Sequence, residues 1–301
     1  MGNFTSEISQ LLPIVGAGSW ALSSFILAQG VIFLFVESFK LFLILLAPFV
    51  AFAVVIHWFE YLSQRRMSER LGWKSVLWTG WLGTPVHELS HVFMCRVFGH
   101  RIDDVALFEP DRDSGRLGYV RHSFEAGNWF QEMGNLFIGI APLIGGSAVL
   151  AILLWLFYPD AAVNAAESTR VTSSDSSLLQ VWDSVVAVVT GIVTISNLTT
   201  LRFWTFVYLV LCVGSHMAPS RCDYQGASRG VIWVGGILLI SVFLLACAGV
   251  NGQQMINGML GIMGPLFAVL GLAILLCGLT TTLVFSLTAF LPIRMDRGDE
   301  H

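Results

Sequence analysis

Long apolar runs recur along the whole chain and are separated by short polar stretches. The clear runs cover residues 41–61, 76–97, 134–158, 201–217, 231–250 and 255–291, and weaker ones cover residues 20–36 and 185–201. A helix that crosses a bilayer needs about 20 consecutive, mostly apolar residues. The longest run can hold one tilted helix or two short ones. The pattern therefore predicts an all-α membrane protein, a polytopic helical bundle of about six to eight membrane segments.

The composition points to the same environment. Of the 301 residues, 55% are hydrophobic and 12% are charged, with a mean hydropathy of +0.73, which lies outside the range of soluble globular domains. A net charge of −4 gives no basic surface for nucleic acid, so we expect no nucleic-acid partner. The cysteines lie in or beside apolar runs at unrelated spacings, which favours packing roles over disulfides or a CxxC metal site. They are Cys95, Cys212, Cys222, Cys247 and Cys277.

The polar stretch at residues 99–127 carries both charge signs and predicts a small β-hairpin. Its centre is the turn-rich sequence EPDRDSG, flanked by the segments VALF and RLGYV. Apolar segments on either side of such a turn are typical of paired strands. We therefore expect strands at residues 105–108 and 116–120, with Gly115 at the turn.

Two other polar stretches bear on the orientation in the membrane. Residues 159–183 are acidic and rich in alanine and serine, which predicts a flexible loop on the non-cytoplasmic side. Residues 63–75 are basic, but they cannot be cytoplasmic together with residues 99–127 if one helix joins the two. The sequence leaves this conflict open. The acidic loop and a basic C-terminal tail favour a cytoplasmic 99–127, with 63–75 misassigned or lying along the membrane surface.

The apolar run at residues 76–97 contains the sequence HELSH, which has the spacing of a metal site. On an α-helix His87 and His91 lie one turn apart on one face, so both imidazoles can reach one metal ion. Glu88 lies about 100° around the helix from His87, where it can act as a general base on a metal-bound water. Ionisable groups at membrane depth are costly without partners, which makes this cluster a functional site.

The residues before HELSH predict where the helix that carries it begins. Thr84 and Pro85 fit the N-cap and the first helical residue. Gly80 and Gly83 lie just upstream and favour a break in the backbone. Broken backbone at membrane depth is tolerated where it lines a water-filled cavity, and hydrolysis needs water at that place.

A third protein ligand is required, because a catalytic zinc has three and leaves the fourth position to water. Asp223, after the run that closes near residue 217, is the first candidate and His216 is the second. We interpret Glu37 and Glu60 as interfacial charges that lie beside basic residues, and His57 as an interfacial or packing residue.

These motifs together resemble the site-2 protease family of intramembrane zinc metalloproteases. That family combines an H-E-x-x-H helix, a membrane-associated β-hairpin, a helix with an A-G-P-x-x-N-like sequence, and a later Pro-rich stretch with a metal-binding Asp followed by Gly. This chain has HELSH, the predicted hairpin after residue 99, FIGIAPLIGGS at residues 137–147 and MAPSRCDYQG at residues 217–226.

The resemblance implies a site and an activity. Asp223 would complete the ligand set with His87 and His91, holding one Zn²⁺ per chain, and Glu88 would be the catalytic base. The implied function is an intramembrane zinc-dependent endopeptidase that cleaves a transmembrane or membrane-associated protein, as in regulated intramembrane proteolysis. We expect a multi-pass integral protein of a prokaryotic cell membrane.

The same resemblance divides the chain into three parts. Residues 1–75 would hold N-terminal membrane segments and the basic connector. Residues 76–230 would hold the metallopeptidase core, whose last helix would end at Asp223, and residues 231–301 the C-terminal membrane helices with a short tail. No polar loop is long enough for a soluble regulatory domain. Control of access is therefore expected from the membrane helices or from a regulatory membrane partner.

The hairpin has two interpretations. An exposed strand edge could pair with an unwound substrate and replace its lost backbone hydrogen bonds, with Val105, Leu107, Leu117 and Tyr119 as candidate substrate-binding residues. Alternatively, the hairpin only plugs the cavity.

The chain also departs from the family pattern. Ala141 and Pro142 stand where the family usually has Gly-Pro, Gly145 stands where an Asn is common, and two residues separate Asp223 from Gly226. The amide that would stabilise the oxyanion is therefore not identified by the motif. The candidates for that role are Asn135 and Asn197, which also fit helix-packing polar residues.

Two other functions stay open at the level of sequence. One is a membrane zinc peptidase that resembles the CAAX-type proteases, acts on soluble peptide tails and takes its third ligand from a Glu. The other is a membrane transporter or scaffold that has kept the metal site without hydrolysis.

Overall fold

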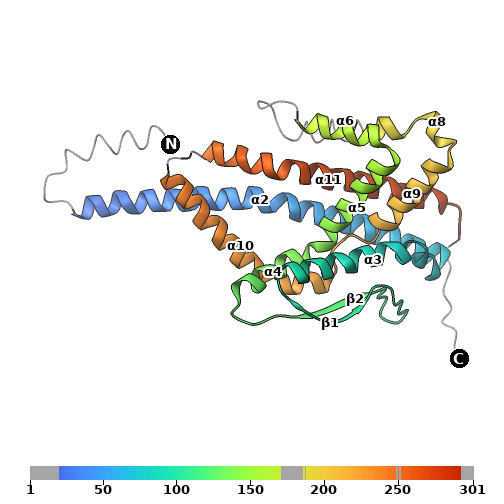
Figure 1. The fold of residues 1–301 in the computed structure, drawn as a ribbon, viewed down its shortest axis with the longest axis horizontal. Coiled ribbons are helices and arrows are strands. Elements are labelled where there is room, and N and C mark those ends of the chain that lie inside the picture. The colour runs from blue at the N-terminus through green and yellow to red at the C-terminus, as the bar shows by residue number, and fades with distance from the viewer. Residues whose placement is uncertain (1–19, 171–185, 187, 249, 251, 293–301) are drawn as a thin grey trace. The chain divides into compact units, whose positions relative to one another are not determined.

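The computed structural model describes residues 20–170, 186, 188–248, 250 and 252–292. This part of the chain is mostly helical and contains one two-stranded antiparallel sheet (Figure 1). Its described residues form two compact units, one within Met1–Ala47 and Val234–Ile262 and the other within Pro48–Trp233 and Met263–His301. The second unit contains every candidate site residue.

The element order matches the predicted helical class, with a hairpin directly after the HELSH helix. The strands are β1 (Arg101–Ala106) and β2 (Tyr119–Ser123). The helices are α2 (Trp20–Leu71), α3 (Lys74–Val97), α4 (Trp129–Gly139), α5 (Ala141–Phe157), α6 (Pro159–Arg170), α8 (Ile195–Leu198), α9 (Leu201–Gly214), α10 (Arg221–Cys247) and α11 (Gly252–Leu287).

Among the described residues, one helical stretch, Cys222–Leu245 of α10, is long and apolar enough to cross a bilayer. Helices α4 and α5 reach that criterion together as a pair bent by 54°. Helix α9 and the stretch Ala273–Leu287 of α11 are apolar but shorter. The larger number of six to eight membrane segments stays a prediction.

The core of the second unit lies between α2, α5, α9 and α11. Its largest fully buried side chains include one or more from each of these helices: Ile56, Leu143, Leu150, Phe206 and Leu270. Tyr158, at the end of α5, packs edge-on against Phe206 with ring centroids 5.2 Å apart. The core therefore packs α5 against α9, the helix that precedes Asp223 in the sequence.

Helix α3 is continuous through the predicted break, so the prediction of a helix that begins at Thr84 and Pro85 is wrong. Pro85 lies inside α3 and Thr84 is buried in it. The upstream glycines serve close packing instead. A Cβ atom on Gly83 would lie 2.9 Å from the Cβ of His216 and closer still to the carbonyl oxygen of Cys212. Glycine at this position therefore lets α9 approach α3.

The hairpin exists where it was predicted, but its strands lie further from the turn. The register pairs Ala106 with Tyr119 and Val105 with Val120, so Leu107 and Leu117 fall in the connecting loop. Polar residues explain the difference. The Ser114 hydroxyl donates to the Asp111 carboxylate at 2.6 Å, and such local bonds compete with a strand ladder.

The turn itself has the predicted glycine. Gly115 has a φ of 71°, a left-handed value that favours glycine. The Asp111 backbone N–H donates to the Arg116 carbonyl at 2.8 Å, which closes the loop across this residue. The Ser114 hydroxyl and the Asp113 N–H both donate to the Asp111 carboxyl and lower its pKa.

The apolar run at residues 134–158 is not one straight helix. It is broken at Ile140 into α4 and α5, whose axes differ by 54°. Pro142 stands at the start of α5 and cannot donate a hydrogen bond to the carbonyl four residues earlier, which is that of Ile138. Pro142 therefore accounts for the bend in the segment that was predicted as one helix.

The polar stretches also differ from the expectation. The first part of the predicted flexible loop at 159–183 is helix α6, which begins with Pro159 and Asp160, residue types suited to a helix N-terminus. The remainder, residues 171–183, lies outside the described residues.

The basic connector at residues 63–75 is mostly the end of α2. Two of its arginines bind the chain beyond the end of α11. Arg66 donates to the Thr288 hydroxyl at 3.1 Å and Arg70 donates to the Leu291 carbonyl. Cations at a helix C-terminus stabilise it, which gives these charges a role other than marking the cytoplasmic side.

We expect Gly83→Ala to lower the stability of the protein by about 1–3 kcal/mol, because the new methyl group forces α3 and α9 apart. Thermal unfolding in detergent measures this. Gly236→Ala is the matched control, since no described atom lies within 4 Å of a Cβ at that position, and alanine favours helix there. Equal melting temperatures for both variants would contradict the close contact.

Candidate metal centre

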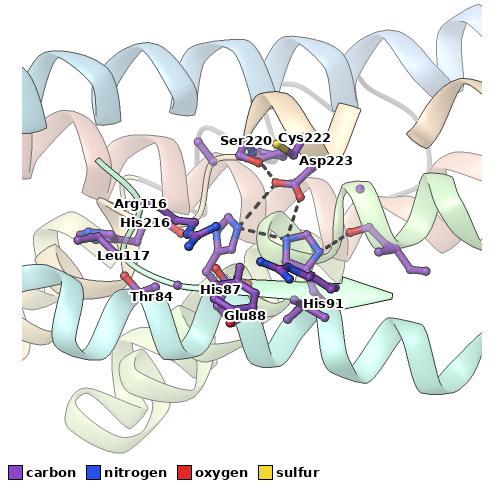
Figure 2. Close-up of a pocket in the computed structure, with 18 of the residues that line it drawn as sticks. Thr84, His87, Glu88, His91, Arg116, Leu117, His216, Ser220, Cys222 and Asp223 are labelled. Atoms are coloured by element: carbon purple, nitrogen blue, oxygen red, sulfur yellow. Dashed lines mark hydrogen bonds and ion pairs between the residues drawn. The ribbon is translucent and has the colours of Figure 1, made fainter. Parts of the chain in front are cut away.

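Two elements bring His87, His91 and Asp223 into one group. The histidines lie one turn apart on α3, and Asp223 lies in the first turn of α10. The Nε2 atoms of the histidines are 3.2 Å apart. Asp223 Oδ1 is 3.2 Å from His91 Nε2, and Asp223 Oδ2 is 3.7 Å from His87 Nε2. Figure 2 shows the carboxylate facing both rings. This group could hold a metal ion.

Backbone carbonyls fix the proton on each imidazole. His87 Nδ1 lies 2.8 Å from the His216 carbonyl oxygen, and His91 Nδ1 lies 2.9 Å from the Ile138 carbonyl oxygen. A carbonyl oxygen only accepts, so each Nδ1 carries the hydrogen and each neutral Nε2 presents a lone pair. Two lone pairs and a carboxylate then face one another. Acceptors gathered in this way repel unless a cation lies between them, which is the property of a metal site.

The break between α4 and α5 supplies one of these carbonyls. In a continuous helix the Ile138 oxygen would accept from residue 142, but Pro142 has no N–H. The freed oxygen accepts from His91 instead. The APLIGG sequence therefore positions an imidazole on another helix.

The N-terminus of α10 positions the carboxylate. Asp223 lies in the first turn of α10, and its Oδ2 accepts from the Ser220 backbone N–H at 2.6 Å. An acid that binds back to the N-cap in this way is half of a capping box, and the helix dipole favours negative charge there. The expectation that Asp223 ends the preceding helix is wrong. Helix α9 ends at Gly214, and residues 215–220 connect it to α10.

A cavity of about 820 Å³ adjoins the group. It is lined by the candidate ligands, by Glu88, and by residues of α2, the hairpin and the segment before α10. Glu88 is 6% exposed. The hairpin lies directly over it, since a Cβ on Gly118 would be 3.0 Å from Glu88 Cγ and 2.8 Å from Thr84 Cγ2. The Glu88 side chain therefore lies between α3 and the hairpin, beside the two histidines.

The predicted substrate-binding residues separate into two pairs. Leu117 and Tyr119 line the cavity, whereas Val105 and Leu107 do not. The cavity wall is formed by the continuous stretch from residue 114 to residue 122, which contains β2 up to His122. Only the β2 side of the hairpin therefore faces the candidate site.

The two oxyanion candidates also separate. Asn135 is 4% exposed and lines the cavity. Asn197 lies in α8, where its side-chain amide donates to the Ile192 carbonyl at 2.8 Å, and it is not part of the cavity wall. Gly145, at the position where an Asn is common, packs closely against the side chain of Ser90 on α3. The structure therefore brings Asn135, and not Asn197, to this site.

His216, the second candidate for the third ligand, contributes its backbone carbonyl. Its Nδ1 bonds to the Cys212 carbonyl at 3.2 Å, and its Nε2 has no hydrogen-bond partner among the described residues. The Thr84 hydroxyl is buried without a partner in the same part of the chain. Both residues line the cavity, so the cavity offers polar atoms beyond the ligand group.

The sequence analysis missed a second histidine pair, His100 and His122, of which His122 lines the cavity. His100 Nε2 lies 2.8 Å from the Gln131 carbonyl oxygen, and His100 Nδ1 lies 3.0 Å from His122 Nδ1. Burial lowers the pKa of His100, which favours its neutral form. His100 then donates through Nε2 and accepts from His122, whose own Nε2 is left as an acceptor. The signal was a histidine on each side of the hairpin near its base, His100 just before β1 and His122 in β2 opposite Ile102.

The four cysteines whose surroundings the structure describes are free, as the spacing predicted. Cys95, Cys212 and Cys277 are buried, whereas Cys222 is exposed and lines the cavity.

Comparison with models of protein families, with curated proteins and with solved structures gives no match to this chain. The resemblance to the site-2 protease family therefore rests on the motifs in the sequence and on the arrangement of the residues that carry them.

We expect Pro142→Ala to weaken metal binding about 10- to 100-fold, the usual effect of losing a partner of a metal-binding histidine. An alanine N–H at this position can donate to the Ile138 oxygen and compete with His91. Competition titration with a chromogenic chelator measures the affinity. Pro48→Ala, a proline inside α2, is the control for general effects on a helix. Unchanged affinity in Pro142→Ala would rule out this role of the break.

Proposed function

We propose that this chain is an intramembrane zinc-dependent endopeptidase of the site-2 protease type, which cleaves a transmembrane or membrane-associated protein. The observation that carries the proposal is the meeting of two imidazoles with fixed tautomers and one carboxylate beside Glu88, at the wall of a cavity.

The ligand atoms fit zinc in type and in spacing. Two imidazole nitrogens and a carboxylate oxygen are a common ligand set of catalytic zinc, which keeps a fourth position open. Ligand atoms about 2.0–2.1 Å from a tetrahedral ion would lie about 3.3 Å from one another. The two imidazole nitrogens, 3.2 Å apart, are close to that value. Asp223 approaches them with a different oxygen for each, Oδ1 at 3.2 Å from His91 and Oδ2 at 3.7 Å from His87, and one ligand atom from each of the three residues lies within 4.8 Å of the others.

The surface of α3 supports a membrane environment. Its exposed side carries large apolar residues, and its buried side carries polar ones, the reverse of a helix at the surface of a soluble protein. The buried polar residues include Thr79, Thr84, Glu88 and His91. The exposed apolar residues are Trp78, Trp81, Leu89, Phe93 and Val97, between 49% and 63% exposed. Such a surface is suited to lipid, and the apolar runs along the chain extend this to a multi-pass protein.

The proposed reaction is hydrolysis of a peptide bond. A bound zinc ion would supply Lewis-acid polarisation of the scissile carbonyl and a water of lowered pKa. Glu88 is one residue from His87 and lines the same cavity, so it can take the proton from that water and later give it to the leaving amine. The amide of Asn135 is the candidate donor to the oxyanion from the protein.

The hairpin is suited to hold the substrate. Strand β2 pairs only with β1 among the described strands, and the cavity lies along the β2 side. A substrate helix must unwind locally before its peptide bond is accessible. An extended substrate segment could add to the free edge of β2, with Leu117 and Tyr119 contacting its side chains. Gly118 holds the hairpin close to Glu88 just before β2 begins, so a segment paired with that edge would lie near the proposed base.

The geometry favours this proposal over a CAAX-type peptidase. The acid nearest to both histidines is Asp223, whereas Glu60 has its carboxylate oxygens bonded to Gln64 and to the backbone of Ala218. A transporter or scaffold with a retained metal site is distinguished by the activity of Glu88 variants.

Purified protein is expected to contain one zinc ion per chain, measured by inductively coupled plasma mass spectrometry. Asp223→Ala and His87→Ala are expected to lose it, because two ligands rarely retain zinc. Glu37→Ala is the control, since Glu37 is paired with Lys40 on α2. Full zinc content in Asp223→Ala would remove the proposed ligand set.

Glu88→Gln is expected to keep the zinc and to lower the cleavage rate by about 10²- to 10⁴-fold, since the amide cannot act as a base. Fluorogenic single-helix membrane peptides in detergent micelles serve as probes. Cleavage that is equally fast in wild type and Glu88→Gln would end the peptidase hypothesis. Zinc binding without any cleavage by the wild type, across substrates of this kind, would favour the transporter or scaffold.

A further inference from the structure

The segment at residues 215–220 connects α9 to α10 and carries two of the supports of the candidate metal site. Its His216 carbonyl accepts from His87 Nδ1 at 2.8 Å, and its Ser220 N–H donates to Asp223 at 2.6 Å. The Ser215 and His216 N–H groups still donate to carbonyls of α9, at Leu211 and Val213, whereas residues 217–220 lie outside any helix. The positions of the metal-binding atoms therefore depend on whatever fixes this connection.

Two side chains of α2 bind that segment from across the fold. Glu60 Oε2 accepts from the Ala218 backbone N–H at 2.9 Å. Gln64 Nε2 donates to the Ser215 carbonyl at 2.8 Å and to Glu60 Oε1 at 3.0 Å. The two side chains lie one turn apart on α2, so they face the segment together. Between them they bind backbone groups on both sides of His216.

Glu60 carries a carboxylate at a place in the fold where an unpaired charge would be costly. It lines the cavity beside His87 and lies near the end of the apolar run at residues 41–61. A carboxylate in such a place is costly unless it is paired, and it indicates a functional role. Interpretation of Glu60 as an interfacial charge does not account for its bond to the Ala218 N–H, 158 positions away in the sequence.

We infer that Glu60 is a positioning residue of the metal centre. With Gln64 it holds residues 215–218, so that the His216 carbonyl keeps His87 in the tautomer whose Nε2 can bind the metal. Glu60 acts through the backbone of the segment and does not itself contact the ion. This inference rests on the proposed metal site.

The hydrogen bonds argue against Glu60 as a ligand. One of its oxygens accepts from Ala218 and the other from Gln64, so both are directed at the polar groups that they hold. The ligand group is already completed by Asp223, which approaches both histidines. A glutamine at position 60 therefore separates the two roles, since its amide oxygen can accept from Ala218 but is a poor substitute for a carboxylate ligand.

The experiment is a titration of full-length protein in detergent with Co²⁺ alone, followed by its visible absorption. Glu60→Ala is expected to bind about 10- to 100-fold more weakly than the wild type, with an altered spectrum. Glu60→Gln is expected to bind within about threefold of the wild type, because the bond from Ala218 is kept. Thr288→Val is the matched control. It removes the hydroxyl that accepts from Arg66 on the same helix α2, away from the site.

A second measurement does not depend on metal. ¹⁵N NMR of histidine-labelled protein is expected to show His87 protonated at Nδ1 in the wild type, Glu60→Gln and Thr288→Val, and a mixture of tautomers in Glu60→Ala. Melting temperatures are measured alongside. If both Glu60→Ala and Thr288→Val lower the melting temperature, the two variants are still distinguished by the His87 tautomer. It is expected to change in Glu60→Ala and to stay as in the wild type in Thr288→Val.

Each contrary outcome has one meaning. Wild-type affinity and an unchanged His87 tautomer in Glu60→Ala would overturn the inference while leaving the proposed function in place. Loss of Co²⁺ in Glu60→Gln to the same extent as in Asp223→Ala would make Glu60 a ligand and would also overturn it. A wild type that binds neither Co²⁺ nor Zn²⁺ would remove the proposed function, and the tautomer measurement would still decide whether Glu60 positions His87.

Discussion

Two backbone carbonyls govern the chemistry of the candidate site. The oxygens of Ile138 and His216 accept the Nδ1 hydrogens of His91 and His87, and this leaves both Nε2 lone pairs facing Asp223. In a regular helix such oxygens would be used by the backbone. They are available here because each lies where helical bonding stops, at the break caused by Pro142 and in the connection before α10.

The packing around α3 follows from the same arrangement. Gly83 admits α9 and the His216 segment to one side of the helix, and Gly118 brings the hairpin over Glu88 on the same helix. These contacts enclose the polar residues of α3, whereas its tryptophans and Phe93 face outward. A helix with this distribution is stable only if the interior is polar and hydrated and the exterior is apolar. The packing of α3 and the proposed hydrolysis therefore both require a polar, hydrated interior beside this helix.

Local sequence was a good guide where the interaction itself is local. The HELSH spacing placed two imidazoles on one helix face, and the Gly115 turn predicted a hairpin. Local sequence failed at Thr84 and Pro85, because the apparent cap signal competes with tight packing of Gly83 against α9. It also did not indicate that Glu60 accepts a hydrogen bond from the Ala218 backbone, 158 positions away.

The sequence by itself determined the helical class, the hairpin and the two histidines with their adjacent Glu88. These depend on helical periodicity and on turn-forming residues, which act over a few positions. Only the tertiary structure decided that Asp223 reaches both histidines, that β2 rather than β1 faces the cavity, and that Asn135 rather than Asn197 lies there. Those outcomes depend on which helices approach one another, and that is set by packing between segments far apart in the chain.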